Sequence, residues 1–198
     1  MNSIIIDLQR EALDSSQSVT ELLRKAYVVA RKLKVKELKD WIDSELNGHK
    51  CKYEDIPEYR NVNGETKGWN PYRGWIPLLI DDTKISSLLS SRKLPDPITN
   101  LEALINSDFD RLTVTFNAEI RRQLSEWTQF DTDYKMLFSK TQVQSIIESV
   151  RNIVLEWALK LEEEGILGED MSFSEDEKSK AKDMNYTTNN FYGNVTNS

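Results

Sequence analysis

The clearest pattern along the chain is a long amphipathic repeat in its C-terminal third. Between Thr141 and Glu164, apolar residues recur at steps of three and four positions, which is the spacing of one buried face of an α-helix. Thr141 followed by Gln144 is typical of a capping box, and Gly165 is placed to end the helix. The pattern predicts a long helix over residues 141–164 that packs against the core.

The first third of the chain shows the same periodicity in three shorter segments. Ser3 precedes the first segment, Ser18 precedes the second, and the third runs from Val35 to Asn47. Ser is a favoured N-cap residue because its hydroxyl accepts a hydrogen bond from a free N–H of the first turn. With only short breaks between them, these segments predict a hairpin of helices over residues 3–48.

Helical periodicity stops after Lys50, and residues 53–80 carry strand and turn signals. Asn63-Gly64 lies between two short polar–apolar segments, and Asn-Gly supplies the positive φ of a type I′ turn. We therefore predict a β-hairpin with its turn at Asn63-Gly64 and a loop over residues 70–75. Ile76–Ile80 is predicted as an edge strand, because Pro77 cannot donate to a central ladder.

The rest of the chain predicts smaller elements around the long helix. Residues 82–127 are assigned to short helices with one strand at Leu112–Phe116, and a further strand is expected at Tyr134–Phe138. Ser174 begins a short acidic helix over 174–183, and residues 184–198 form an Asn/Thr-rich tail or linker. The expected fold class is mainly α (α+β): a helical bundle with a small antiparallel β-hairpin insertion and a long C-terminal amphipathic helix.

Length, charge and cysteine content narrow the functional classes. The chain has 198 residues, a net charge of -7 and one cysteine, so we expect one domain in a reducing compartment, without a disulfide framework. It has neither a secretory signal nor a membrane-length apolar run, so a cytoplasmic protein is expected. Basic residues gather between Arg24 and Lys39, which suits either a nucleic-acid backbone or a solvated face. The overall acidity favours the solvated face, so nucleic acid is possible as a partner but not favoured.

The sequence carries no recognisable catalytic or metal-binding motif. His49 and Cys51 are the only residues of their types, and two such neighbours cannot form a closed zinc site. The sequence has no Gly-rich phosphate loop and no nucleophile elbow. We therefore predict no catalytic residues, metal or cofactor. The alternative is a metal-independent nuclease site built from Glu58, Tyr59, Arg60 and Arg73.

Two stretches are candidates for binding a partner. The stretch from residue 69 to 75 combines three aromatic rings with a guanidinium, a set that suits a protein hot spot or base stacking. The simpler interpretation is that these rings close one end of the helical core. The interaction candidates are Trp69, Tyr72, Arg73, Trp75, Tyr59 and Arg60. In the tail, Phe191, Tyr192 and Val195 are candidates for self-association through strand pairing.

Three blocks of motifs bear a resemblance to a known family. The first comprises Ile6–Gln9, Ala12–Asp14, Leu22–Ala26, Ala30–Leu33, Trp41–Ile42 and Glu45–Gly48; the second, Pro57–Arg60 and Gly68–Trp69; the third, Val150–Asn152 and Leu155–Gly168. Together they resemble the AbiTii domain of bacterial abortive-infection (phage-resistance) proteins, over about residues 2–183. The tail is similar to an NxxGxVxxS segment that links bacterial defence domains to a further C-terminal region, so we expect such a region to follow.

The resemblance implies a cytoplasmic bacterial protein that limits phage propagation by harming or arresting the infected cell. It carries over no catalytic residues. The first hypothesis is therefore an interaction domain with a sensor, assembly or regulatory role, whose partner is another protein or a second copy joined through the tail. The alternative is a toxic effector enzyme, with a nuclease as its most plausible form, or a nucleic-acid-binding domain.

Overall fold

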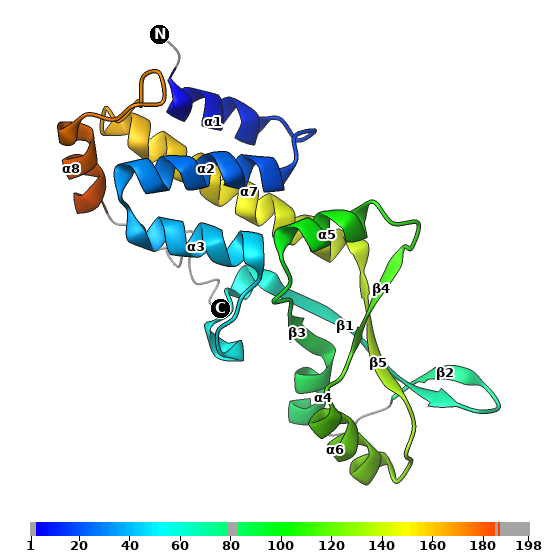
Figure 1. The fold of residues 1–198 in the computed structure, drawn as a ribbon. Coiled ribbons are helices and arrows are strands. Elements are labelled where there is room, and N and C mark those ends of the chain that lie inside the picture. Colours follow the sequence, from blue (N-terminus) through cyan, green and yellow to red (C-terminus); the bar gives the residue numbers. More distant parts are fainter. Residues whose placement is uncertain (1–2, 79–82, 185, 187–198) are drawn as a thin grey trace, which may run out of the picture.

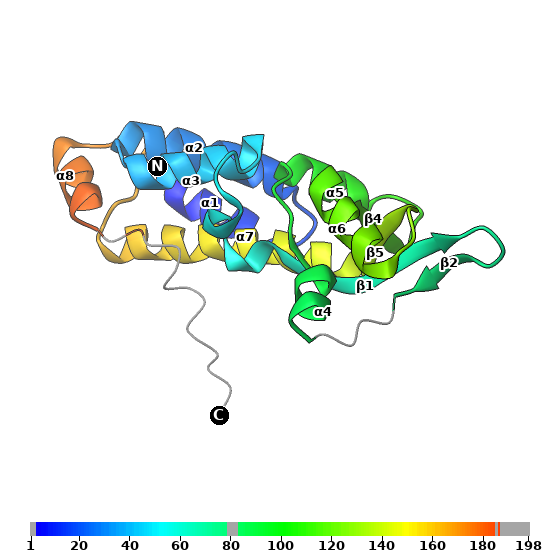
Figure 2. The ribbon, with the colours of Figure 1, turned by 90° about the horizontal axis from the view of Figure 1, so that it is seen from below.

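The longest helix, α7 (Lys140–Glu163), is the axis around which the helical part is built. The computed structural model describes residues 3–78, 83–184 and 186. Figures 1 and 2 show a layer of helices on one side of α7, with α8 at one end of the molecule. Helices α1 (Ile4–Leu13), α2 (Val19–Leu33) and α5 (Ile98–Ile105) pack against α7. Helix α3 (Lys36–Asn47) packs against α2 and α5, and α8 (Glu175–Asp183) packs against α2.

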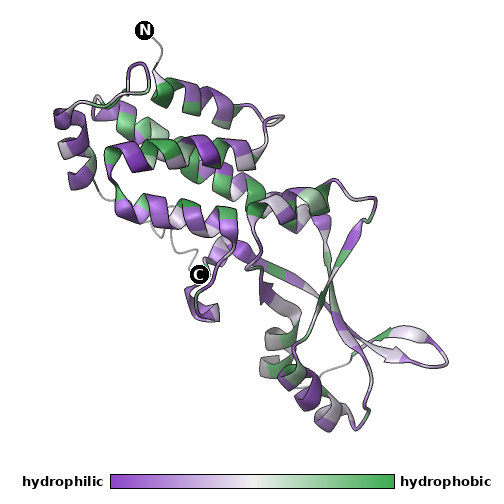
Figure 3. Ribbon diagram, in the orientation of Figure 1, coloured by the Kyte–Doolittle hydropathy of each residue, from purple (hydrophilic) through white to green (hydrophobic). Residues whose placement is uncertain are grey.

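The predicted periodicity of the helices places their apolar residues in one continuous core. In α7, every third or fourth residue from Val143 to Leu161 is buried against α1, α2 and α5. In Figure 3, α2 alternates hydrophobic and hydrophilic residues along its length, as expected when one helix face is buried and the other is solvated. Ser3 and Ser18 cap α1 and α2, each accepting a hydrogen bond from a backbone N–H of the first turn.

The N-cap residue predicted for the long helix was wrong. Ser139, not Thr141, is the N-cap residue, and its hydroxyl accepts a hydrogen bond from the Thr141 N–H at 3.2 Å. The reason is that strand β5 (Tyr134–Ser139) runs directly into the helix, so the last extended residue is Ser139. Because Ser139 and Thr141 both carry a hydroxyl that can cap a helix, the sequence alone does not distinguish them.

A twisted antiparallel sheet extends from the opposite end of the bundle (Figure 1). Its strands lie in the order β2-β1-β5-β4, and β3 pairs with the first part of β1. The mainly α fold with a small antiparallel sheet is therefore confirmed. The strands other than β5 are β1 (Asn61–Asn70), β2 (Gly74–Pro77), β3 (Ser91–Lys93) and β4 (Arg111–Thr115), with helices α4 (Thr83–Ser90) and α6 (Ala118–Thr128) between them.

The predicted hairpin turn at Asn63-Gly64 was wrong. Both residues lie inside the continuous strand β1, and the true turn is Asn70–Gly74, which was predicted as a loop. Gly64 pairs with Phe138 of β5, and a Cβ atom at residue 64 would overlap the carbonyl oxygen of Leu137. The glycine thus permits the close approach of two strands, a role that local turn propensity does not reveal.

The two faces of the sheet differ in their environment. One face carries buried residues, including Val62 and Thr66 of β1 and Met136 and Phe138 of β5. The opposite face alternates with them and carries more accessible residues, among them Glu65, Thr113 and Thr115, which are exposed. The sheet is therefore covered on one side and open to solvent on the other.

Candidate interaction surface

The β1–β2 hairpin carries the first candidate site to the end of the molecule farthest from α8 (Figure 1). Its tip, defined here as Asn70–Gly74, is shaped by the Asn70 side chain. The Oδ1 atom of Asn70 accepts hydrogen bonds from the backbone N–H groups of Tyr72 at 2.9 Å and Arg73 at 3.1 Å. Gly74 closes the turn at a φ of 72°, a conformation that favours glycine. The tip is therefore built locally and projects beyond the sheet.

A pair of tryptophans forms the base of this tip. Trp69 and Trp75 are directly opposite each other on β1 and β2, with ring centroids 5.5 Å apart in an edge-to-face arrangement. Lys135 of β5 lies with its Nζ 3.9 Å from the centre of the Trp75 ring, a cation–π contact. The interpretation that these rings close the helical core is wrong, because they lie on the sheet and Trp69 is 44% exposed.

The remaining two candidates of this stretch point into solvent. Tyr72 is 96% exposed at the tip, and Arg73 beside it is also exposed. A tyrosine and an arginine are two of the residue types most often found as hot spots in interfaces. The structure thus brings Trp69, Tyr72, Arg73 and Trp75 together on one hairpin.

A small apolar slot, which we call the hairpin slot, opens beside the tip. It has a volume of about 140 Å³ and lies between the hairpin and the loop from α6 to β5. Phe130 of that loop forms part of its wall and is 73% exposed. The apolar residues that line the slot are Trp69, Pro71, Ile76, Leu78, Phe130 and Tyr134. An open apolar slot with an exposed aromatic ring in its wall is typical of a protein-binding site.

Acidic residues border the slot. Asp131 and Asp133 are exposed and flank Thr132, whose hydroxyl donates a hydrogen bond to the Trp69 carbonyl at 2.7 Å. Both aspartates line a shallow hollow of about 890 Å³, together with Arg121 and Arg122 of α6. Arg122 is paired with Glu126 at 2.9 Å.

Tyr59 and Arg60, the other two interaction candidates, lie elsewhere. Arg60 is fully buried and forms an ion pair with the fully buried Glu45 of α3. Its Nη1 atom also donates to the carbonyl oxygens of Leu94 at 3.0 Å and Asp96 at 2.6 Å. Glu45 further accepts a hydrogen bond from the Tyr59 hydroxyl at 2.6 Å. We call this set, with His49 and Trp41, the Glu45 network.

Burial and charge act in opposite directions in the Glu45 network. Burial raises the pKa of the Glu45 carboxyl, but the hydrogen bond with His49, at 3.0 Å, and the charge of Arg60 outweigh it and leave that pKa below its usual value. Burial, with the neighbouring Glu45 charge, holds the pKa of the Tyr59 hydroxyl well above its usual value. Trp41 completes the network by donating to the Tyr59 hydroxyl at 2.9 Å. In the Glu45 network the buried charges of Glu45 and Arg60 therefore balance each other, and both groups have hydrogen-bond partners.

The residues of the alternative nuclease site are therefore separated. Tyr59 and Arg60 are held in the interior, whereas Glu58 is exposed and paired with Lys93 at 2.5 Å. Arg73 lies in the turn that follows β1, whereas Tyr59 and Arg60 directly precede β1. Within the described parts of the chain, no group of three or more His, Cys, Asp or Glu residues is arranged to hold a metal ion.

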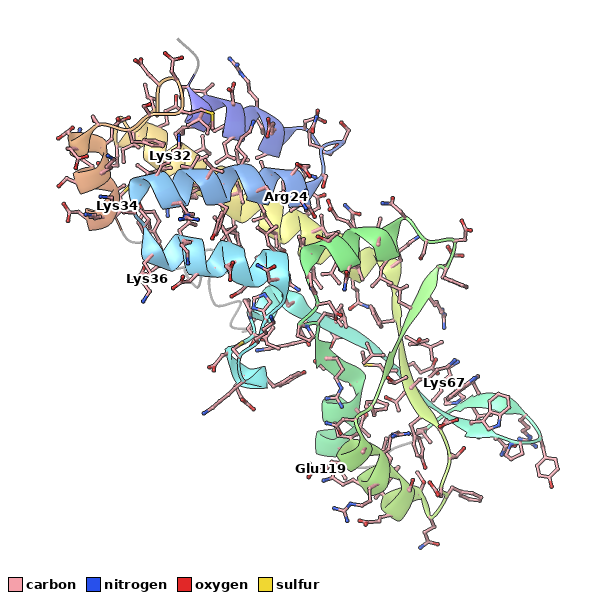
Figure 4. The ribbon with its side chains drawn as sticks, viewed as in Figure 1. Arg24, Lys32, Lys34, Lys36, Lys67 and Glu119 are labelled. Atoms are coloured by element: carbon pink, nitrogen blue, oxygen red, sulfur yellow. The ribbon has the colours of Figure 1, made fainter. Side chains whose placement is uncertain are left out.

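The basic residues between Arg24 and Lys39 belong to the helical layer of α2 and α3 (Figure 4). Arg24, Lys32, Lys34 and Lys36 lie along it, far from Lys67 on the hairpin strand. Arg24 is paired with Glu21 of the same helix, and Lys25 with Glu11 of α1. The Lys32 Nζ donates to the carbonyl oxygen of Met171. Much of this charge is thus already engaged by neighbouring groups.

Several residues that surround the β1–β2 hairpin had no clear signal in the sequence. Phe130, Lys135 and the two aspartates reach the hairpin only because β5 pairs with β1.

The self-association candidates, Phe191, Tyr192 and Val195, lie outside the described residues. In the described part of the chain, no helix is both long and apolar enough to cross a bilayer.

Comparisons with known proteins identify the chain at the level of its family. The AbiTii family model matches residues 3–186, which is nearly the whole chain. No curated protein and no solved structure matches it. The match covers the helical bundle and the sheet with its hairpin alike. The chain therefore belongs to the AbiTii family of abortive-infection proteins, which act in defence against phage.

Proposed function

We propose that this chain is an interaction domain with a sensor, assembly or regulatory role in phage defence, and that its working surface is the β1–β2 hairpin with the hairpin slot. One observation supports this most: Tyr72, Phe130 and Trp69 expose large aromatic surfaces together at one end of the molecule. Large apolar side chains that are exposed close together and bordered by polar residues are typical of a surface that a partner covers.

The distribution of charge favours a protein partner over a nucleic acid. The open side of the hairpin carries Lys67 and Arg73, but Lys67 is paired with Glu65 at 3.2 Å and Lys135 lies against Trp75. Asp131 and Asp133 border the slot. A phosphate backbone would meet these carboxylates without a surplus of free cations to offset them.

The test is a double substitution of the hairpin, Trp69→Ala with Arg73→Ala. Arg73 is exposed and Trp69 is 44% exposed, so the circular dichroism spectrum should be kept, and the loss of the Trp69–Trp75 ring contact should cost about 0.5–1.5 kcal/mol of stability. Bacteria that express the variant should lose protection in a phage plating assay. The matched control is Phe109→Ala with Arg111→Ala, an exposed aromatic and an exposed cation away from the hairpin, which should protect normally. Full protection by the hairpin variant would exclude the hairpin as the working surface.

Expression without phage distinguishes this role from that of a toxic effector. An interaction domain should leave growth unchanged when expressed alone, whereas a toxic enzyme should arrest it. Purified protein incubated with RNA and DNA, with and without a divalent metal, adds a direct assay. Cleavage that persists in a highly purified sample would favour the nuclease over the interaction domain.

A further inference from the structure

We infer that the partner of the hairpin is a second copy of this chain, with Tyr72 of each copy inserted into the hairpin slot of the other. The inference rests on the proposed function of the hairpin as an interaction surface. It goes further by naming the occupant of the slot and the symmetry of the contact.

The first argument is the position of the two complementary features. Tyr72 projects from the tip, whereas Trp69 and Pro71, its close neighbours in sequence, line the slot. In a two-fold dimer the same patch of both copies is used, so a projection and a slot that lie side by side can engage twice at once. The slot is lined mainly by apolar and aromatic groups, which suits the insertion of a phenol ring with its hydroxyl near the polar rim.

The second argument is charge. Arg73 lies beside Tyr72 on the tip, and Asp131 and Asp133 lie beside the slot. No ion pair among the described residues involves any of these three side chains. When Tyr72 of one copy enters the slot of the other, its neighbour Arg73 is brought toward the aspartates. The charges of tip and slot border are therefore complementary.

The contact is small, so its strength should be modest. A hairpin tip in a slot on each side covers less area than a standard protein interface, which places the expected dissociation constant in about the micromolar range. The oligomeric state should therefore depend on concentration, and sedimentation velocity over a dilution series is the suitable measurement. We expect a dimer that dissociates on dilution.

The first set of variants tests the inserted ring. Tyr72→Ala should weaken the dimer by at least tenfold, because it empties the slot of each partner. Tyr72→Phe should retain the dimer, since the ring is kept, and Phe109→Ala should behave as the parent protein. A parent protein that stays monomeric across the whole series overturns the inference. So does a dimer that Tyr72→Ala leaves intact, including one formed through the tail of residues 187–198.

The second set tests the symmetry through exchanged charges. Arg73→Asp should be monomeric, because each tip then meets aspartates. The double variant Asp131→Lys with Asp133→Lys should also be monomeric, because each Arg73 then meets lysines. An equimolar mixture of the two proteins should form a heterodimer, since both of its contacts join opposite charges. Variants that stay monomeric when mixed overturn the arrangement, and no change in a single copy would produce the expected rescue.

The outcomes separate this inference from the proposed function. If the protein is monomeric but the Trp69→Ala and Arg73→Ala variant loses protection, the hairpin binds something other than a second copy. Binding of a labelled single-stranded oligonucleotide that needs Trp69 would identify one such partner and overturn the inference. If the dimer forms and responds to the Tyr72 and charge variants, but dimer-deficient variants protect fully, the inference stands and the proposed function fails.

Discussion

Removing the cation from the Glu45 network should destabilise the protein far more than removing an exposed arginine. In Arg60→Met the side chain keeps much of its apolar bulk but loses its charge. Glu45 is then left as a buried carboxylate with only His49 and Tyr59 to solvate it. The carbonyl oxygens of Leu94 and Asp96 also lose their buried donor.

The expected magnitude follows from these losses. Removing one partner of a buried ion pair costs about 3–5 kcal/mol, because the other charge stays buried without compensation. The remaining donors to Glu45 favour the lower end, about 3 kcal/mol. With a urea dependence of about 2 kcal/mol per molar, the unfolding midpoint should fall by roughly 1.5 M. This is a large part of a total stability of about 5–15 kcal/mol.

Urea unfolding at pH 7, followed by circular dichroism, measures the effect. Arg111→Met is the control, because Arg111 is exposed on β4 and its loss should change stability by less than about 0.5 kcal/mol. The double variant Glu45→Leu with Arg60→Met removes both charges and should recover part of the loss, although Tyr59 then lacks its acceptor. A midpoint for Arg60→Met within experimental error of the control would refute the reasoning.

Two further predictions concern the same fold. Because the folded-state pKa of Glu45 lies below its usual value of 4.5, its ionisation contributes stability that is present above pH 4.5 and lost as pH falls through the lower folded pKa. Unfolding midpoints from pH 7 to pH 3 should therefore fall more steeply for the parent than for Glu45→Gln, and parallel profiles would exclude Glu45 as the source. Gly64→Ala should destabilise by about 1–3 kcal/mol in the same urea assay, because its Cβ meets the Leu137 backbone. An unchanged midpoint would show that β1 and β5 separate at little cost.

The helices of this fold could be predicted because their signals are local. The spacing of apolar residues along α2 and α7 and the serines before α1 and α2 act within a few residues of each other. The sheet could be predicted only in part. The turn propensity of Asn63-Gly64 is local, but the pairing of Gly64 with Phe138 joins distant parts of the chain and overrides it.

The candidate surface divides in the same way. The aromatic residues around the tip were visible as a dense stretch of the sequence, yet Phe130 reaches the slot, and Asp131 its border, through long-range strand pairing. The sequence of α3 does contain one signal for the buried position of Arg60. Trp41 and Glu45 are four residues apart and so share one face of α3, next to the apolar positions Leu38 and Ile42. A carboxylate on the buried side of a helix calls for a buried cation.

The position of the Glu45 network gives it a further consequence for the hairpin. Glu45 belongs to α3 of the bundle, Arg60 immediately precedes β1, and Leu94 and Asp96 follow β3, so the network joins the bundle to the strand that carries the hairpin. Weakening it should reduce protection by unfolding or loosening the whole chain, in proportion to lost stability. Hairpin variants should instead remove protection while the chain stays folded, with a loss of stability much smaller than that of Arg60→Met. A comparison of Arg60→Met with Trp69→Ala and Arg73→Ala therefore separates the structural use of an arginine in this protein from its use in binding.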